Sequence, residues 1–214
     1  MNVDKLRYIV VEGPIGAGKT SLARSLARRL GAEALLEAPD ENPFLARFYE
    51  DMRRFALPTQ LNFLFQRVDQ LRGLNQLDMF KRATVADFLL DKDPLFARLN
   101  LTDDEFALYD KVYSHLKPQT PTPDLVIYLQ APVNTLVDRV HKRGVDYERS
   151  ISEHYLARLA DAYSSYFYSY DDAPLLIVNS ERLNFVDDEG HLKLLLEHIA
   201  GMRGRREFFN LGQR

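Results

Sequence analysis

Short apolar runs alternate along this chain with longer segments in which apolar residues recur every three or four positions. The runs have the length and the β-branched content of buried strands, whereas the longer spacing is typical of amphipathic helices. Alternation of this kind predicts an α/β protein with a parallel sheet and helices on both faces. The five runs that predict strands are YIVVEG (8–13), ALLE (34–37), ATVAD (83–87), DLVIYLQA (124–131) and PLLIVNS (174–180).

Helix boundaries are marked by residues that can satisfy free backbone groups. Thr102 with Glu105, and Ser150 with Glu153, have the spacing of a capping box, in which each side chain accepts a hydrogen bond from a backbone amide of the other. Gly31 is placed to end the first predicted helix, because glycine adopts the left-handed conformation found after helix ends. The pattern therefore predicts helices that begin after Thr102 and Ser150.

The length of the chain, 214 residues, is that of one domain, and no repeat, low-complexity tract or Pro/Gly-rich linker divides it. We therefore expect a single domain over residues 1–214, with a core over about 7–202 and a basic tail over 203–214. Phe208 and Phe209 in the tail can pack on the body, but a frayed surface segment is favoured over a functional arm.

Composition excludes several classes of protein. The chain is 46% hydrophobic and 28% charged, and its formal charge of -3 predicts no strong attraction to nucleic acid. The lack of cysteine excludes disulfides and thiolate metal sites. The first apolar run is too short for a signal peptide, and no segment approaches the roughly 20 apolar residues of a membrane span. We expect a cytoplasmic protein with no membrane partner.

The strongest chemical motif lies between the first predicted strand and the first predicted helix. Gly13, four residues, then Gly18, Lys19 and Thr20 match the phosphate-binding pattern G-x-x-x-x-G-K-[ST]. Backbone amides at a helix N-terminus bind phosphate, lysine adds a point charge, and the threonine hydroxyl can hold Mg²⁺. The motif predicts a nucleoside triphosphate with magnesium, bound by Gly13, Pro14, Ile15, Gly16, Ala17, Gly18, Lys19, Thr20 and Ser21.

A second magnesium ligand is expected at the end of a neighbouring strand. Asp87 follows the run ATVAD directly, so with Thr20 it is the predicted metal site and lies at the substrate edge of the sheet. Asp91 and Asp93 provide competing carboxylates. An aspartate at a strand end is also common as a turn former or a helix cap.

The phosphate acceptor has to be inferred from the second strand. Glu37 ends that strand at the carboxyl edge of the sheet, where open α/β proteins bind ligands. A carboxylate there can take the proton of a neutral alcohol, whereas an acceptor that is already a phosphate would favour arginine. As the alternative, Glu37 caps the next helix, although Asp40 and Asn42 are better placed for that role.

Six segments together resemble the deoxynucleoside kinase family, above all its bacterial deoxyadenosine/deoxyguanosine kinases. The resemblance extends from about Tyr8 to Asn179 and implies a P-loop kinase fold with a short arginine-bearing lid and a homodimer. The segments are GPIGAGKTS (13–21), EAPDENPFLARFYED (37–51), TQLNFLFQR (59–67), ADFLLDKDPLFARLNL (86–101), PDLVIYLQA (123–131) and RVHKRGVDYE (139–148).

The resemblance assigns roles to residues that match the family pattern. It implies that Glu37 is the general base on the nucleoside 5′-hydroxyl, with Lys19 among the catalytic residues. It further implies that Tyr49 and Glu148 hold the sugar 3′-hydroxyl. The alternative for Tyr49 is a structural role in the core or at the rim, because buried tyrosines commonly find a hydrogen-bond partner.

Further implied roles concern the nucleobase and the phosphates. Gln60, Arg67 and Asp93 are expected to face the base, since amide, guanidinium and carboxylate groups can pair with its polar edge. Arg139 and Arg143 are expected to reach the transferring phosphates from the lid. A plain amphipathic helix would also place Gln60 and Arg67 on one face, and a solvated charged face would account for the two lid arginines.

One departure from the family pattern lies beside Asp87. In many family members the strand-end acid is followed by arginine and serine, but here Phe88 follows. The arginine that elsewhere steadies the catalytic base is therefore absent. Lys92 and Arg67 are the candidates to replace it.

A second departure lies in the lid. The family usually has Arg-Gly-Arg there, whereas this chain has Arg143, Gly144 and Val145. The transition state therefore loses one cation, which predicts slower turnover or compensation by Arg149 or Lys142.

The leading hypothesis is an enzyme that transfers phosphate from ATP to the 5′-hydroxyl of a deoxynucleoside, preferably a purine, for nucleotide salvage. The alternatives are a monophosphate kinase of the thymidylate-kinase type and a non-catalytic nucleotide-binding protein. A GTP switch is disfavoured because the chain has no N-K-x-D motif and no D-x-x-G switch directly after the third predicted strand. The helices TQLNFLFQRVDQL (59–71) and DEFALYDKVYSHL (104–116) offer an apolar face for the implied homodimer.

Overall fold

Six parallel strands form one sheet in the order β2-β3-β1-β4-β5-β6. The computed structural model describes residues 1, 3–76, 83–117, 121–185 and 188–211. The parallel sheet with helices on both faces is confirmed, but the expected count of five strands is wrong by one. The strands are β1 (Tyr8–Glu12), β2 (Glu33–Leu35), β3 (Thr84–Ala86), β4 (Leu125–Gln130), β5 (Leu175–Asn179) and β6 (Arg206–Asn210).

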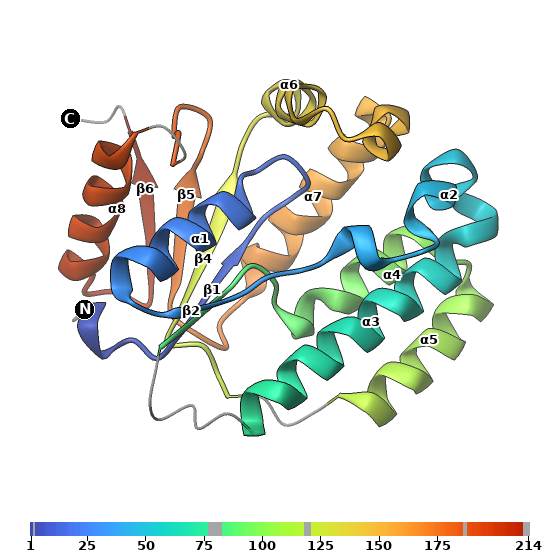
Figure 1. The fold of residues 1–214 in the computed structure, drawn as a ribbon, viewed down its shortest axis with the longest axis horizontal. Helices are drawn as coiled ribbons and strands as arrows, with labels where there is room; N and C mark the ends of the chain where they lie inside the picture. Colours follow the sequence, from blue (N-terminus) through green and yellow to red (C-terminus); the bar gives the residue numbers. More distant parts are fainter. Residues whose placement is uncertain (2, 77–82, 118–120, 186–187, 212–214) are drawn as a thin grey trace.

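Helices follow most of the strands and cover the sheet (Figure 1). The α-helices are α1 (Lys19–Leu30), α2 (Leu45–Glu50), α3 (Met52–Gln76), α4 (Asp93–Asn100), α5 (Asp103–Leu116), α6 (Val133–Arg143), α7 (Glu153–Ser169) and α8 (Glu189–Gly201). Short 3-10 helices are η1 (Val3–Lys5), η2 (Pro39–Glu41), η3 (Leu90–Lys92) and η4 (Asp146–Ser150).

Alternate residues of each strand face opposite layers, as the two-residue period of a strand requires. In β4, Leu125 and Ile127 pack with α1, α6 and α8, whereas Val126 and Tyr128 pack with α7. The strands β1 and β4 are therefore buried on both faces, which explains why they read as continuous apolar runs.

The helices α3, α4 and α5 lie together beside the sheet (Figure 1). A third apolar cluster fills the space between them. Phe88, which follows β3, is fully buried in this cluster, and Leu64 and Tyr109 pack there from α3 and α5. The residue that departs from the family pattern after Asp87 therefore belongs to the packing of the helices.

Two of the three predicted helix ends are confirmed. Thr102 caps α5 with a complete capping box, and Gly31 ends α1 in the left-handed conformation with φ of 61°. The prediction for Ser150 is wrong, because the cap of α7 is Ser152, whose hydroxyl accepts a hydrogen bond from the Tyr155 amide at 3.1 Å. Ser150 instead ends η4.

The basic tail supplies the sixth strand, so the expectation of a frayed segment is wrong for residues 206–210. They pair in parallel with β5 over five residues, from Leu175 with Arg206 to Asn179 with Asn210. Phe209 packs against the core and lies 5.3 Å from the His198 ring, whereas Phe208 is 68% exposed. Residues 212–214 of the tail lie outside the described residues. The single domain over 1–214 stays a prediction.

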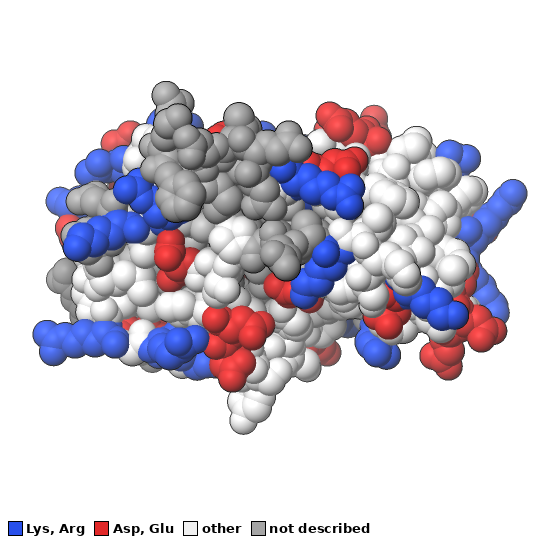
Figure 2. Space-filling model, turned by 90° about the horizontal axis from the view of Figure 1, so that it is seen from below, with Lys and Arg blue, Asp and Glu red and all other residues white. Residues whose placement is uncertain are grey.

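The surface carries both signs of charge. On the face shown in Figure 2, basic and acidic side chains are interspersed, in keeping with the small net charge. Uncharged side chains predominate at the right of that view, where α3 and α5 lie in Figure 1. Within the described part of the chain, no helix is long and apolar enough to cross a membrane.

The packing of β6 predicts different costs for its two phenylalanines. Phe209→Ala should lower the free energy of unfolding by about 2–3 kcal/mol, somewhat less than a fully buried phenylalanine would cost, because Phe209 is only partly buried. Phe208→Ala is the matched control and should change it by less than about 0.5 kcal/mol. Urea denaturation measures both, and equal effects would contradict the assignment of β6.

Candidate active site

A glycine-rich loop connects β1 to α1 and packs tightly against neighbouring backbone. A Cβ at Gly13 would lie 2.6 Å from the Leu129 carbonyl oxygen, and one at Gly16 would lie 2.7 Å from the Leu136 carbonyl oxygen. Both residues also have positive φ, so only glycine fits. The sheet and α6 therefore fix the path of the loop.

Lys19 is the first residue of α1, at the helix end where free amides favour a phosphate. Its ammonium donates a hydrogen bond to the Pro14 carbonyl oxygen at 3.2 Å and so lies over the loop. Burial lowers the pKa of the ammonium, against the opposing charges of Glu12 and Glu37. An anion bound at the loop would stabilise the charged ammonium and so oppose the effect of burial on its pKa.

Asp87 connects the phosphate loop to the second strand. Its carboxylate accepts hydrogen bonds from the Thr20 hydroxyl at 2.6 Å and from the Glu37 amide at 2.8 Å. Burial, and after it the charge of Glu37, raises the pKa of this carboxyl. A divalent cation would relieve both effects, and Mg²⁺ commonly takes only one or two protein oxygens. The residues present therefore fit magnesium, although the described residues hold no cluster of three or more His, Cys, Asp or Glu.

Arg67 on α3 holds two carboxylates at once. Its Nε donates to Glu37 Oε1 at 2.7 Å, its Nη2 bonds the same oxygen, and its Nη1 bonds Asp93 Oδ2. The other oxygen of Asp93 accepts a hydrogen bond from the Tyr109 hydroxyl. Asp93 is fully buried. The Arg67 guanidinium and the Tyr109 hydroxyl offset the cost of burying its charge.

This arrangement decides the protonation state of Glu37. Burial by itself raises the pKa of the carboxyl, but the positive charges of Arg67, Lys92 and Lys19 outweigh it and hold the pKa below its usual value. Of the two candidates to replace the missing arginine, Arg67 makes the direct contact. Lys92 contributes through its charge.

A second buried network lies behind the cavity. Lys92 lies 3.4 Å from Glu12 Oε1, and its ammonium faces the rings of Phe96 and Tyr163 at 4.6 and 5.5 Å. Glu12 also accepts hydrogen bonds from the Leu89 amide and the Tyr163 hydroxyl. Lys92 is therefore a paired cation within the wall of the cavity.

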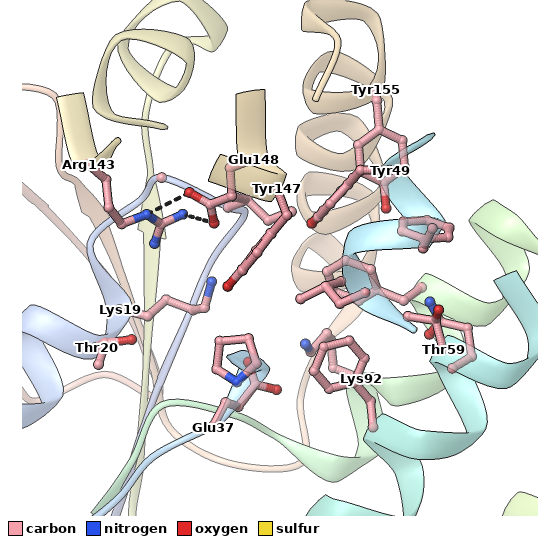
Figure 3. Close-up of a pocket in the computed structure, with 18 of the residues that line it drawn as sticks. Lys19, Thr20, Glu37, Tyr49, Thr59, Lys92, Arg143, Tyr147, Glu148 and Tyr155 are labelled. Carbon is pink, nitrogen blue, oxygen red and sulfur yellow. Dashed lines mark hydrogen bonds and ion pairs between the residues drawn. The ribbon is translucent and has the colours of Figure 1, made fainter. Parts of the chain in front are cut away.

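A cavity of about 180 Å³ opens beside these groups. In Figure 3, Lys19 and Thr20 lie at one end of it and Thr59 lies at the other, with Glu37 between them. Such a shape suits a ligand that presents one end to the phosphate loop and the other to α3. Aromatic residues supply much of the wall: Phe48, Tyr49, Phe63, Phe96, Tyr147, Tyr155 and Tyr163.

The rim of the cavity is formed by η4 and η2. The Tyr147 hydroxyl donates to Asp40 Oδ1 at 2.8 Å, and its ring stacks on Tyr49 with centroids 6.2 Å apart. Arg143 Nε donates to Glu148 Oε2 at 2.8 Å (Figure 3). Burial and the bond to Asp40 raise the pKa of Tyr147, so its hydroxyl keeps the proton that it donates. The Asp40 carboxylate therefore accepts a hydrogen bond from Tyr147 at the rim and does not cap a helix.

The structure brings most of the predicted site residues to this cavity. Those on its wall include Glu37, Tyr49, Gln60, Arg67, Arg143 and Glu148, together with Ile15, Gly16, Gly18, Lys19, Thr20 and Ser21 of the loop. Asp87 touches Thr20 from behind, and Asp93 lies behind Arg67 without a surface on the cavity.

Arg139 is placed differently from the expectation that it reaches the phosphates. Its guanidinium donates to the carbonyl oxygens of Ala17 at 3.4 Å, Ser180 at 2.6 Å, Glu181 at 3.3 Å and Leu183 at 3.3 Å. These bonds tie α6 to the phosphate loop and to the segment after β5. Within the described chain, neither Lys142 nor Arg149 lines the cavity to compensate for Val145.

The polar wall residues without a prediction from the sequence are Thr59, Tyr147, Tyr155 and Tyr163. Thr59 begins the segment TQLNFLFQR, but the family resemblance assigns a role to Gln60 and none to Thr59. Tyr147 and Tyr155 stand in a chain with eleven tyrosines, and nothing in their spacing separates them from core residues.

Comparisons with known proteins identify the family of the chain. A family model described as deoxynucleoside kinase matches residues 9–202. The chain belongs to the deoxynucleoside kinase family. The expectations of an enzyme, a kinase with the P-loop kinase fold, are therefore confirmed.

Individual relatives are similar over most of their length. The chain is 32% identical to the deoxyadenosine kinase of Lactobacillus acidophilus, with 91% of this chain and 95% of the relative covered. It is 30% identical to the deoxyguanosine kinase of Bacillus subtilis, with 90% and 95% covered. The solved structure of M. mycoides deoxyadenosine kinase with bound dATP superimposes with a TM-score of 0.78 at 26% identity, covering 90% of this chain and 98% of that one.

Removal of Arg67 should leave its partners as uncompensated buried charges. Arg67→Met is expected to lower the free energy of unfolding by about 3–5 kcal/mol at pH 7, measured by urea denaturation. Adding Asp93→Asn should recover part of the loss, because it removes one unpaired charge. A single variant as stable as the native protein would contradict the network.

The difference in the free energy of unfolding between the native protein and Arg67→Met should depend on pH. The pKa of Glu37 is depressed in the folded protein, so its contribution to stability is present above its unfolded value of about 4.3 and is lost as the pH falls through the folded value. The difference between the native protein and Arg67→Met should therefore narrow in acid. A difference that grows below pH 4 would contradict this.

Proposed function

We propose that the protein transfers the γ-phosphate of ATP to the 5′-hydroxyl of a deoxynucleoside, preferably a purine, as a step of nucleotide salvage. The observation that carries the proposal is Glu37, a carboxylate held ionised on the cavity wall between the phosphate loop and α3. The curated relatives named above, a deoxyadenosine kinase and a deoxyguanosine kinase, support a purine acceptor.

The donor side rests on the loop from Gly13 to Ser21. Backbone amides at the start of α1 and the Lys19 ammonium would bind the β- and γ-phosphates of ATP. Thr20 and Asp87 would hold Mg²⁺, which when bound neutralises charge on the phosphates. Arg143, at the end of α6, is paired with Glu148 on the cavity wall and would have to leave that pair to add positive charge near the transferred group.

Glu37 is suited to accept the acceptor's proton. Arg67 donates two hydrogen bonds to Glu37, and both are accepted by Oε1. Among the described residues, none donates a hydrogen bond to Glu37 Oε2. In the proposed step the 5′-hydroxyl gives its proton to Oε2 while its oxygen bonds to the γ-phosphorus. The bond from that phosphorus to the β-γ bridging oxygen breaks, and ADP leaves. Arg67 keeps Glu37 ionised and oriented for this step.

The rest of the cavity would hold the acceptor. Tyr49 and Glu148 lie at the rim, where they can hold the sugar 3′-hydroxyl, and Gln60 lies on α3, where it can meet the base. Asp93 would act by orienting Arg67, since it has no surface on the cavity. Arg139 would act by holding the loop in place.

A monophosphate kinase would need free cations for the phosphate of its acceptor. Besides Lys19, the cations on the described cavity wall are Arg67, Lys92 and Arg143, and each is already paired with a carboxylate. This pairing favours a neutral alcohol over an acceptor phosphate.

Assembly as a homodimer through α3 and α5 is part of the proposal. Phe65 on α3 and Leu108 on α5 are 47% and 51% exposed, and the two helices contact each other. Large apolar side chains exposed on adjacent helices are typical of an interaction surface. The family resemblance supports a second copy of the chain as the partner.

A coupled ADP assay tests the proposal with deoxyadenosine, deoxyguanosine, deoxycytidine, thymidine and thymidylate. We expect turnover of the purine deoxynucleosides. Glu37→Gln should lower kcat by roughly 10²- to 10⁴-fold with unchanged ATP binding, because it removes the base and keeps the shape. Glu41→Gln, an exposed neighbour, is the matched control and should keep full activity.

Two outcomes would contradict the proposal. Turnover of thymidylate alone would favour the monophosphate kinase, and no turnover of any substrate would favour a non-catalytic nucleotide-binding protein. Full activity of Glu37→Gln would remove that residue from the chemistry.

A further inference from the structure

Thr59 lies on the cavity wall and carries a buried hydroxyl without a partner among the described residues. Its side chain is fully buried and lies on the cavity wall, and its Oγ1 has no hydrogen-bond partner among the described residues. A threonine inside a helix usually bonds a carbonyl oxygen three or four residues earlier, and buried hydroxyls are nearly always paired. The unpaired hydroxyl therefore points to a polar partner that the protein does not supply.

The backbone around Thr59 is held in place. Pro58 precedes it within α3 and removes one helical hydrogen bond, while the buried Asn42 side chain donates to the Thr59 carbonyl oxygen at 3.1 Å. Asn42 itself is fixed by accepting a hydrogen bond from the Phe44 amide. The backbone that carries the Thr59 side chain is thus held in place before any ligand binds.

The place of Thr59 in the cavity identifies the part of the ligand that it would meet. It lies at the end opposite Lys19 and Thr20, with Glu37 between (Figure 3). If the phosphates bind at the loop and the sugar hydroxyl at Glu37, the far end receives the nucleobase. Phe63, one helical turn after Thr59 on the same face, also lines the cavity and can pack on a planar ring.

We propose that Thr59 reads the polar edge of the nucleobase together with Gln60 and is a specificity-determining residue. The inference rests on the proposed function. Asp93 lies behind Arg67, and Arg67 is held by Asp93 and Glu37, so the two buried polar side chains left on this part of α3 are Thr59 and Gln60. A hydroxyl both donates and accepts, so it can pair with an amino or a carbonyl group of the base.

Two variants of the full chain test the inference. Thr59→Val keeps the shape and removes the hydroxyl, whereas Thr59→Ser keeps the hydroxyl. For the preferred purine deoxynucleoside, Thr59→Val should lower kcat/KM by roughly 5- to 100-fold, because a polar group of the base is then buried without a partner. Thr59→Ser should retain most of it. KM for ATP should not change in either variant.

The Tm of Thr59→Val distinguishes a role of Thr59 in binding the base from a role in stabilising the fold. Because Thr59→Val removes an unpaired buried hydroxyl, its Tm should stay the same or rise by about 2–4 °C while nucleoside selectivity falls. A Thr59→Val enzyme with native selectivity, or a Thr59→Ser enzyme as impaired as Thr59→Val, would overturn the role of Thr59 alone. A native protein that phosphorylates no nucleoside would overturn the proposed function and this inference with it.

Discussion

The buried contact of Arg67 with Glu37 and Asp93 ties the parts of the site together. Glu37 follows β2, Arg67 belongs to α3, and Asp93 begins α4, so one guanidinium joins the edge of the sheet to the helical cluster. Arginine suits this position because it stays charged and presents several donors in a plane. The cost of burying these charges is offset only if all three stay in contact, which fixes the wall of the cavity.

The same pairing of charges favours phosphate transfer to an alcohol over transfer to the phosphate of a nucleoside monophosphate. A carboxylate with a depressed pKa can take a proton from an alcohol, and the cations around it are already matched by Asp93, Glu12 and Glu148. Lys19 remains for the donor phosphates. Under the proposed function, the cavity would hold one nucleoside triphosphate and one uncharged acceptor, and Thr59 and Gln60 would read the base.

Local signals in the sequence were enough for the sheet and the phosphate loop. Glycines with fixed spacing and apolar runs reflect backbone constraints that act within a few residues, so β1 to β5 and the loop from Gly13 were predictable. The strand β6 was missed because its burial alternates and its neighbours are basic, which is also the composition of a surface tail.

The contacts within the site depended on the fold. Arg67 and Asp93 were expected to face a base, but their 26-residue separation gave no sign that they would bind each other. The Arg139 bonds to four carbonyl oxygens and the unpaired Thr59 hydroxyl likewise depend on how distant segments meet. Resemblance to a family supplied the residues of the site, and the geometry assigned them to the wall or to its support.

A crystal structure with bound 2′-deoxyadenosine tests the central claim most directly. It should show the 5′-oxygen within about 2.6–3.2 Å of Glu37 Oε2, the distance required of a general base, with the adenine against α3 beside Gln60. A nucleoside bound with its base toward Lys19, or with its 5′-oxygen away from Glu37, would contradict the account.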